Sequence, residues 1–186
     1  GFAEYYYLFP GHFVFKVPDE LPDEAVASAN CAASQAVYSL RESGMRMGDN
    51  VVVQGAGGLG IVATAVAKDM GAASVTVIDG VPGRLELARQ CGADNTIDIT
   101  EYTTSESRIE RVKELTEGRG ADVVIEVCGD PSVIPQGLDM LRARGRYAIT
   151  GIVFPNADVT LDTNRILRRM LTISGVHNYH PRHLVQ

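Results

Sequence analysis

The sequence predicts an α/β fold built on a doubly wound, parallel six-stranded sheet with the strand order 3-2-1-4-5-6. Two observations predict this fold. Short runs rich in Val and Ile alternate along the chain with segments of helical periodicity, which is typical of parallel βαβ units. A glycine-rich turn, Gly55–Gly60, directly follows the first of these runs and opens a helical segment. A turn of this kind is where such sheets bind phosphate groups.

The predicted strands are apolar runs bounded by glycine or polar residues. The run Val51–Val53, which lies between Gly48 and Gly55, is continuous rather than alternating, as expected of a strand buried on both faces. The same criteria predict strands over residues 50–54, 74–79, 95–99, 121–127, 146–150 and 171–176.

The predicted helices follow from residue spacing and from end signals. Leu59, Ala63 and Val66 recur at the spacing of one helical face. Comparable signals predict helices over residues 23–44 (with a break allowed near residues 30–31), 59–70, 82–91, 103–117, 130–143 and 164–170. Thr103 and Glu106 have the spacing of a capping box that opens the fourth of these helices.

Composition and charge exclude several classes of function. The 186 residues carry 17 Lys and Arg against 23 Asp and Glu, and the net charge is −6. An acidic chain without a Lys/Arg cluster is not typical of a nucleic-acid binder. No apolar run approaches the ~20 residues that span a bilayer, so we expect no membrane partner. Three widely spaced cysteines without a CxxC motif suit the reducing cytosol and predict a cytoplasmic protein.

The first residues of the chain predict two short strands, Phe2–Leu8 and His12–Val17, which end before Pro18 and Pro22. They lack the basic and apolar regions of a signal peptide. The chain starts with Gly1 inside a strand-like segment. We therefore expect it to be a piece of a longer polypeptide.

The glycine-rich turn is a dinucleotide-binding fingerprint of the Rossmann type, G-x-G-x-x-G, in the strand–turn–helix context that the motif requires. Gly55 permits the tight turn, Gly57 lets the backbone approach the pyrophosphate, and Gly60 lets the helix pack closely on the strand. Gly58, within the same motif, is also a candidate cofactor-binding residue. Since no Lys-Ser/Thr pair follows Gly60, the pattern is not a P-loop. The alternative is a glycine-rich turn without a ligand.

Asp79 ends the second predicted strand, 19 residues after Gly60. A carboxylate at this place accepts hydrogen bonds from the adenosine ribose hydroxyls and repels a 2′-phosphate, so it favours NAD over NADP. Arg84 is a candidate partner of the ribose or of a phosphate. The alternatives are a turn-forming aspartate at the strand end and a solvated arginine on the following helix.

Four segments together resemble the zinc-type medium-chain alcohol dehydrogenases: Ala27–Leu40 (ASANCAASQAVYSL), Gly48–Gly60 (GDNVVVQGAGGLG), Val75–Asp79 (VTVID) and Asp122–Gly129 (DVVIEVCG). Gly1–Pro22 resembles the last strands of that family's GroES-like catalytic domain. The resemblance therefore implies a short remnant of a GroES-like β domain over 1–22, an NAD-binding Rossmann domain over 23–178 and the start of a return segment over 179–186.

The resemblance implies that Cys31 is the third protein ligand of a catalytic zinc ion, which would keep one position open for the substrate oxygen. The other two ligands would lie upstream of Gly1. We therefore expect the chain alone neither to hold zinc nor to oxidise alcohols. Without the resemblance, Cys31 is a small buried hydrophobic residue, as most free cysteines are.

The resemblance also implies a set of cofactor contacts at the ends of the predicted strands. Gln35 departs from the family, which commonly has Thr near the nicotinamide. The implied contacts are Leu59, Val127, Cys128, Gly129, Thr150, Gly151, Ile152, Val176 and Asn178. Ordinary packing at strand ends is the alternative, above all for Val127 and Ile152.

Four further polar residues are candidates for a functional site. His177, His180 and His183 are spaced three apart, but Pro181 breaks any helix that would align them as metal ligands. Glu126 lies at the end of an apolar strand, and we expect it to be held there by hydrogen bonds rather than to act in catalysis.

These observations lead to one functional hypothesis and two alternatives. The hypothesis is the cofactor-binding domain of an NAD-dependent, zinc-dependent oxidoreductase, with NAD(H) and a small alcohol, polyol or carbonyl compound as partners. The alternatives are a zinc-free reductase of activated alkenes or quinones and a non-catalytic dinucleotide-binding module. The predicted edge strand 171–176 is apolar and favours a homodimer or homotetramer.

Overall fold

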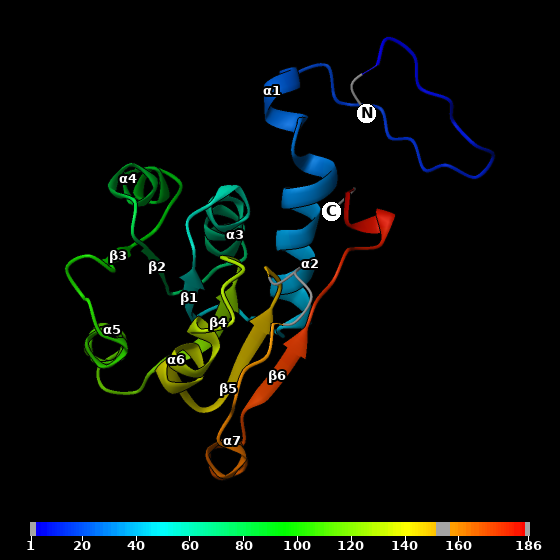
Figure 1. Cartoon of the computed structure of the whole chain (residues 1–186). Helices are drawn as coiled ribbons and strands as arrows, with labels where there is room; N and C mark the ends of the chain where they lie inside the picture. Colours follow the sequence, from blue (N-terminus) through cyan, green and yellow to red (C-terminus); the bar gives the residue numbers. More distant parts are fainter. Residues whose placement is uncertain (1–2, 152–156, 185–186) are drawn as a thin grey trace.

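The computed structural model describes residues 3–151 and 157–184, and it is built around one six-stranded parallel sheet (Figure 1). The strand order is β3-β2-β1-β4-β5-β6, with every neighbouring pair parallel. The strands are β1 (Asn50–Gln54), β2 (Ser74–Asp79), β3 (Asn95–Asp98), β4 (Ala121–Glu126), β5 (Leu141–Ile149) and β6 (Thr172–Gly175). This confirms the predicted doubly wound α/β fold.

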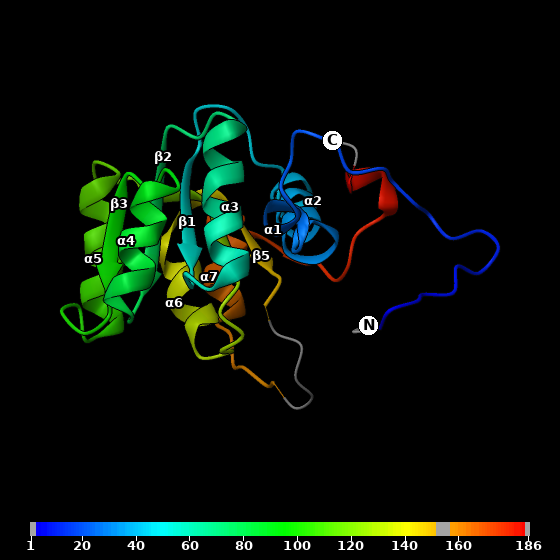
Figure 2. The ribbon, with the colours of Figure 1, turned by 90° about the horizontal axis from the view of Figure 1, so that it is seen from above.

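Helices cover both faces of the sheet (Figure 2). One face packs against α2 (Ser34–Glu42), α3 (Gly58–Asp69) and α4 (Pro82–Gln90). The other packs against α5 (Ser105–Leu115) and α6 (Val133–Met140), and α7 (Thr163–Arg169) contacts β5. The chain reverses its direction across the sheet between β3 and β4. The ends of β1 and β4 therefore form the switch point of the fold.

The core consists of two apolar layers, one on each side of the sheet. Val51, Val53 and Val77 point into the layer beneath α3 and α4, whereas Val52 and Val124 point into the layer beneath α5 and α6. All five are at most 1 % exposed. The continuous apolar runs in the sequence exist because both faces of the central strands are covered.

The segment 23–44, predicted as one helix with a break near residues 30–31, is interrupted at that place. A short helix α1 (Asp23–Val26) is followed by a π-helical turn, η1 (Ala29–Ala33), and then by α2. The Ser34 hydroxyl donates a hydrogen bond to the Ala29 carbonyl over the interruption. Cys31 lies inside η1, so its backbone departs from regular helix geometry.

The predicted capping box of α5 is wrong by one residue. Thr104, not Thr103, is the N-cap, and its hydroxyl accepts a hydrogen bond from Ser107 N–H at 3.1 Å. The Ser107 hydroxyl takes the reciprocal role that was predicted for Glu106, contacting Thr104 N at 3.3 Å. A hydroxyl three residues after the N-cap therefore takes the place of the carboxylate in this box.

The boundary between α6 and β5 also differs from the prediction. The helix predicted over 130–143 is confined to 133–140, and the strand predicted to begin at Arg146 begins at Leu141. At the amino end, the Asp130 carboxylate accepts a hydrogen bond from Ser132 N–H and forms a turn. At the other end, β5 passes a register irregularity beside β4, and Arg144 has a positive φ of 60°.

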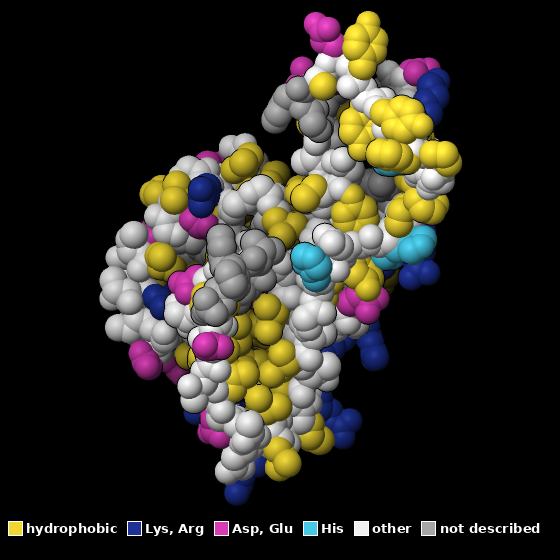
Figure 3. Space-filling model, turned by 45° about the vertical axis from the view of Figure 1, so that its right-hand side comes forward, with side chains coloured by type: hydrophobic (Ala, Val, Ile, Leu, Met, Phe, Trp, Pro, Cys, Tyr) yellow, Lys and Arg dark blue, Asp and Glu magenta, His cyan; other side chains and the backbone are white. Residues whose placement is uncertain are grey.

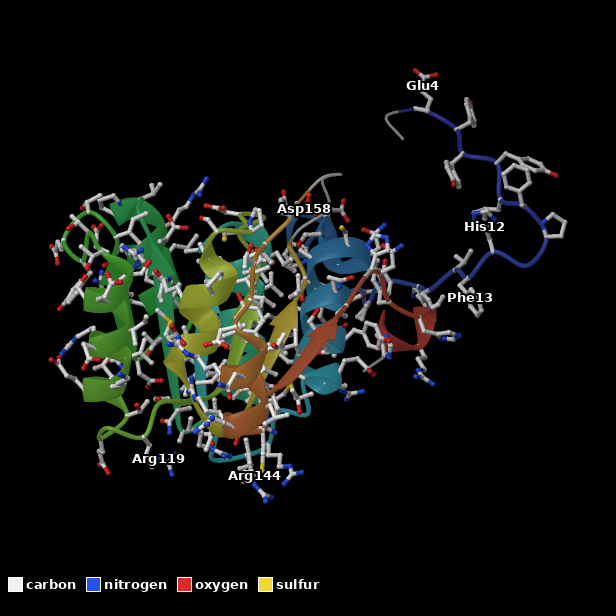
Figure 4. The ribbon with its side chains drawn as sticks, turned by 60° about the horizontal axis from the view of Figure 1, so that its bottom comes forward. Glu4, His12, Phe13, Arg119, Arg144 and Asp158 are labelled. Carbon is white, nitrogen blue, oxygen red and sulfur yellow. The ribbon has the colours of Figure 1, made fainter. Side chains whose placement is uncertain are left out.

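The two strands predicted near the start of the chain do not form within the described residues, and Phe2 lies outside them. Residues 3–17 form no strand, and they make a turn at residues 10–11 in which His12 N–H donates to the Phe9 carbonyl. Their aromatic side chains are exposed, Tyr5 by 89 %. Figure 3 shows hydrophobic side chains gathered at this end of the molecule, and Figure 4 shows Glu4 and His12 away from the sheet. An apolar alternating segment becomes a strand only where another strand pairs with it.

Where the structure describes the chain, no helix has both the length and the apolar character needed to cross a bilayer.

Candidate functional site

The candidate site lies at the carboxyl ends of the central strands, where a cleft of about 330 Å³ opens between the loops that follow β1, β2 and β4. Gln54 and Gly55 contribute from β1, Asp79 and Gly80 from β2, and Cys128 from the loop after β4. This is the switch point of the sheet, where open α/β folds bind ligands.

The glycine-rich turn is the most tightly packed part of the site. Gly55 has a φ of +107°, and a Cβ there would lie 2.8 Å from the Cβ of Cys128. A Cβ on Gly60 would overlap the carbonyl oxygen of Gly55. These two positions require glycine because the first turn of α3 presses directly on the end of β1 and on the loop after β4.

The approach to the start of α3 is open. A Cβ on Gly57 or on Gly58 would meet no atom of the described residues within 4 Å. Gly57 is the N-cap of α3 in an extended conformation, and no side chain in the described part of the chain caps the helix. The first N–H groups of α3 are therefore free to bind a phosphate group, which the helix dipole also favours. The arrangement fits the pyrophosphate of a dinucleotide.

Leu59 follows on the same turn of α3. It is partly buried and packs against the core layer beneath α3.

Asp79 holds two loops of the site together. One carboxylate oxygen accepts a hydrogen bond from Ala56 N–H at 2.7 Å, and the other accepts one from Val81 N–H at 2.9 Å. Arg84 lies 3.9 Å away as an ion-pair partner and is 56 % exposed in its side chain, whereas that of Asp79 is 10 % exposed. A carboxylate has about four acceptor sites. Asp79 therefore acts as a turn residue and still has lone pairs for ligand hydroxyls.

The loops after β4 and β5 are joined by Glu126, which is fully buried. Its Oε1 accepts a hydrogen bond from Gly129 N–H at 2.6 Å, and its Oε2 accepts one from Gly151 N–H at 3.0 Å. A Cβ on Gly151 would lie 2.7 Å from the carbonyl carbon of Val127. Glu126 is thus the hydrogen-bonded strand-end group that the sequence predicts.

The remaining predicted residues of these two loops lie at the same edge. Val127 N–H donates to the Gln54 carbonyl at 3.0 Å, and the Thr150 hydroxyl donates to Ser39 Oγ at 3.2 Å. Desolvation raises the pKa of the Cys128 thiol to about 11, and the Glu126 carboxylate adds to the effect. Ile152 lies outside the described residues.

The segment after β6 is hydrogen-bonded to Gln35 of α2. Val176 N–H donates to the Ile149 carbonyl, and the Val176 carbonyl accepts a hydrogen bond from Gln35 Nε2 at 3.3 Å. Asn178 has a positive φ of 57°, and its amide lies 3.2 Å from His177 Nε2. The Gln35 side chain therefore joins α2 to the residue that follows β6.

Cys31 is exposed on η1. Nowhere in residues 3–151 or 157–184 do three His, Cys, Asp or Glu side chains come together in a way that could hold a metal ion. Zinc sites take at least three protein ligands. The ligand set that these residues offer at Cys31 therefore does not fit a zinc ion. The ring of the nearby His183 stacks on Tyr38 with centroids 4.6 Å apart.

No sequence motif predicts the inner wall of the cleft. Arg108 and Gln136 line it, and they come from the middle of α5 and α6. Neither residue belongs to a short motif, because their meeting depends on how the two helices pack. Ile99, Ser132 and Val133 complete that side.

Comparison with known proteins places these features in a family. A family profile described as zinc-binding dehydrogenase matches residues 58–186. L-threonine 3-dehydrogenase of Bacillus subtilis is 39 % identical over 176 residues, which are 94 % of this chain and 48 % of that protein. Erythritol/L-threitol dehydrogenase of Mycolicibacterium smegmatis is 36 % identical over 92 % of this chain and 46 % of its own length.

Solved structures agree with the sequence relatives. The crystal structure of an alcohol dehydrogenase from Thermotoga maritima superposes with a TM-score of 0.87 and 33 % identity, over 92 % of this chain and 47 % of that one. The chain spans about half the length of the curated relatives that it matches.

We predict that Gly60→Ala destabilises the chain by about 1–3 kcal/mol, because the added methyl group forces α3 away from the carbonyl of Gly55. Gly58→Ala, two residues earlier, is the matched control and should leave the free energy of unfolding within about 0.5 kcal/mol of the parent. Urea denaturation followed by circular dichroism measures both. Equal effects of the two substitutions would contradict the close packing described here.

We also predict that Cys128 reacts with maleimide at pH 8 on the order of 100-fold more slowly than an ordinary thiol. A thiol with a pKa of about 11 is far less ionised at that pH than one with the usual pKa of ~8.5. Its rate should rise about tenfold per pH unit up to pH ~11. Peptide mass spectrometry resolves Cys128 from Cys31 and Cys91, and rapid labelling of Cys128 at pH 8 would contradict the raised pKa of this thiol.

Proposed function

Because the chain belongs to the zinc-binding dehydrogenase family, we propose that it is the cofactor-binding part of an enzyme that transfers a hydride between an alcohol or polyol and NAD. The observation that carries the proposal is the glycine turn at the switch point, with open space at Gly57 and Gly58 and a carboxylate, Asp79, beside it. This arrangement suits a dinucleotide that lies across the strand ends.

In this proposal the start of α3 binds the pyrophosphate. The free N–H groups of the first turn donate to the phosphate oxygens, and Gly57 and Gly58 allow the close approach. Asp79 receives the ribose hydroxyls of the adenosine half on its remaining lone pairs and repels a 2′-phosphate. Arg84, whose side chain is 56 % exposed beside Asp79, neutralises part of the phosphate charge.

The nicotinamide half lies toward Leu59, Val127 and the start of the loop after β5. When bound, the nicotinamide ring accepts or donates the hydride. The chain's own contribution is to shape this side of the site. The Glu126 carboxylate binds the loops at Gly129 and Gly151 and so sets the distance between them. Val176 and Asn178 close the far end, and Gln35 holds the Val176 backbone in place.

The substrate class is inferred from the relatives. By their names they act on L-threonine and on erythritol or L-threitol, which are compounds with a secondary or primary hydroxyl group beside other polar groups. An alcohol or polyol is therefore the proposed substrate of the whole enzyme.

We further propose that the protein is a homodimer or homotetramer that pairs through β6. This strand lies at the edge of the sheet, with its outer backbone groups unpaired within the described residues. A strand edge with unpaired backbone groups is commonly covered by a second copy. The free cysteines are consistent with a cytoplasmic location.

We predict that Asp79→Asn weakens NAD binding about tenfold and narrows the preference over NADP, because the charge that holds the ribose hydroxyls and repels a 2′-phosphate is removed. Asp94→Asn is the matched control. Asp94 also accepts a backbone N–H, that of Val75 at 2.7 Å, but it does so at the opposite end of the sheet. Titration calorimetry with both cofactors measures the effect, and an unchanged preference in Asp79→Asn would contradict the role of this carboxylate.

A second prediction concerns the metal. The purified chain should contain no stoichiometric zinc and should form no NADH from alcohols, because Cys31 is a single ligand where at least three are needed. Mass spectrometry of the metal content and absorbance at 340 nm measure the two properties. One zinc ion per chain that a chelator removes would overturn this prediction.

A further inference from the structure

The inner part of the cleft extends past Asp79 between the sheet and the helices α5 and α6. Its walls are apolar where Ile78, Ile99 and Val133 line it. Its end is polar, because Arg108 of α5 and Gln136 of α6 meet there. Apolar walls with a few fixed polar groups are typical of a site for a flat ring system.

Arg108 is held in one orientation by three acceptors. Its Nε donates to Gln136 Oε1 at 2.7 Å, one terminal nitrogen donates to the Tyr102 carbonyl at 2.7 Å, and the other donates to Ser105 Oγ at 3.4 Å. Desolvation lowers the pKa of Arg108, although a guanidinium stays charged at neutral pH. The side chain is thus fixed before any ligand enters.

Gln136 is the group that this arrangement orients. Only 6 % of the residue is exposed. Arginine donates and never accepts hydrogen bonds, so the contact with Arg108 fixes which end of the carboxamide is oxygen. Its Nε2 has no hydrogen-bond partner among the described residues, and the side chain lines the cleft. Among the described residues the buried side-chain nitrogen or oxygen without a partner is Arg146 Nε and not Gln136 Nε2. The Gln136 amide nitrogen is therefore accessible from the cleft and available to a ligand acceptor.

We propose that Gln136, oriented by Arg108, reads the edge of the adenine base in this cleft and makes the site selective for adenine over other purines. The inference rests on the proposed function, since it assumes a dinucleotide in the cleft. A glutamine carboxamide pairs with adenine through two hydrogen bonds: its oxygen accepts from the N6 amino group, and its nitrogen donates to N7. Oε1 keeps a lone pair beside Arg108, and Nε2 is free.

The pattern discriminates between bases. Hypoxanthine carries a carbonyl oxygen in place of the N6 amino group, so it would set an acceptor against Gln136 Oε1. A site built to hydrogen-bond a particular group rejects an analogue that lacks it, because the site's own polar atom loses its partner. Arg108 acts as a positioning residue, and Gln136 makes the contact with the base.

The test compares NAD with nicotinamide hypoxanthine dinucleotide by titration calorimetry. The parent chain should bind NAD about 10-fold or more tightly than the analogue. In Gln136→Leu the ratio of the two dissociation constants should fall close to one. In Arg108→Met it should fall part of the way, since the carboxamide is then free to rotate.

Two controls separate this role from a structural one. Gln90→Leu on α4 and Arg111→Met on α5 change the same residue types outside the cleft, Gln90 at an exposed and Arg111 at a half-buried position, and both should keep the parent ratio. A general loss of stability weakens both ligands alike and leaves the ratio unchanged, so the ratio reports the base contact alone. Thermal unfolding without ligand records any loss of stability.

The outcomes are distinct. A parent chain that binds NAD but binds the hypoxanthine analogue equally well overturns the inference and leaves the proposed function standing. An unchanged ratio of the two dissociation constants in Gln136→Leu also overturns the inference and leaves the proposed function standing. A parent chain that binds neither dinucleotide overturns the proposed function, and the inference falls with it. A ratio that collapses only in Gln136→Leu and Arg108→Met supports both.

Discussion

The contact between Gly60 and Gly55 sets the geometry on which the whole site depends. Because neither residue has a side chain, the first turn of α3 rests on the carbonyl at the end of β1. Two consequences follow from this contact. The free N–H groups of α3 point across the strand ends, and the loop after β4 is drawn against Gly55 through Cys128. Any larger residue at either position separates the helix from the switch point.

The loops around this contact are held by carboxylates that act on backbone N–H groups. Asp79 joins the glycine turn to the start of the β2–α4 loop, and Glu126 joins the loops after β4 and β5. A carboxylate that accepts backbone hydrogen bonds is a strong, directional clamp. Both clamps lie at strand ends, so the rigidity of the sheet is passed on to the loops that would contact a ligand.

Residues that obey a local rule were predictable from the sequence. The strands Asn50–Gln54 and Ser74–Asp79 have the predicted bounds because their apolar runs are buried on both faces. Glu126 was predictable because a carboxylate at a strand end needs hydrogen-bond donors. The strands predicted over 2–8 and 12–17 were wrong within the described residues, since a strand depends on a partner that a local pattern does not reveal.

The contact between Gln136 and Arg108 could not be predicted from the sequence for a related reason. It depends on the packing of α5 against α6, and the start of α6 is held by hydrogen bonds to the core. The Tyr147 hydroxyl donates to Gln54 Oε1 at 2.7 Å, and Gln54 Nε2 donates to the Val133 carbonyl at 3.0 Å. Val133 opens α6, the helix that carries Gln136.

This chain of hydrogen bonds links the buried centre of the sheet to the end of the cleft. Tyr147 is fully buried and packs against Gly137, where any side chain would overlap its ring. The first turn of α6 is therefore fixed both by contact and by hydrogen bonds, and Gln136 has little freedom to move relative to β1. Since the glycine turn leaves the same strand one residue later, the phosphate end and the base end of the site are positioned by a single element, Asn50–Gln54.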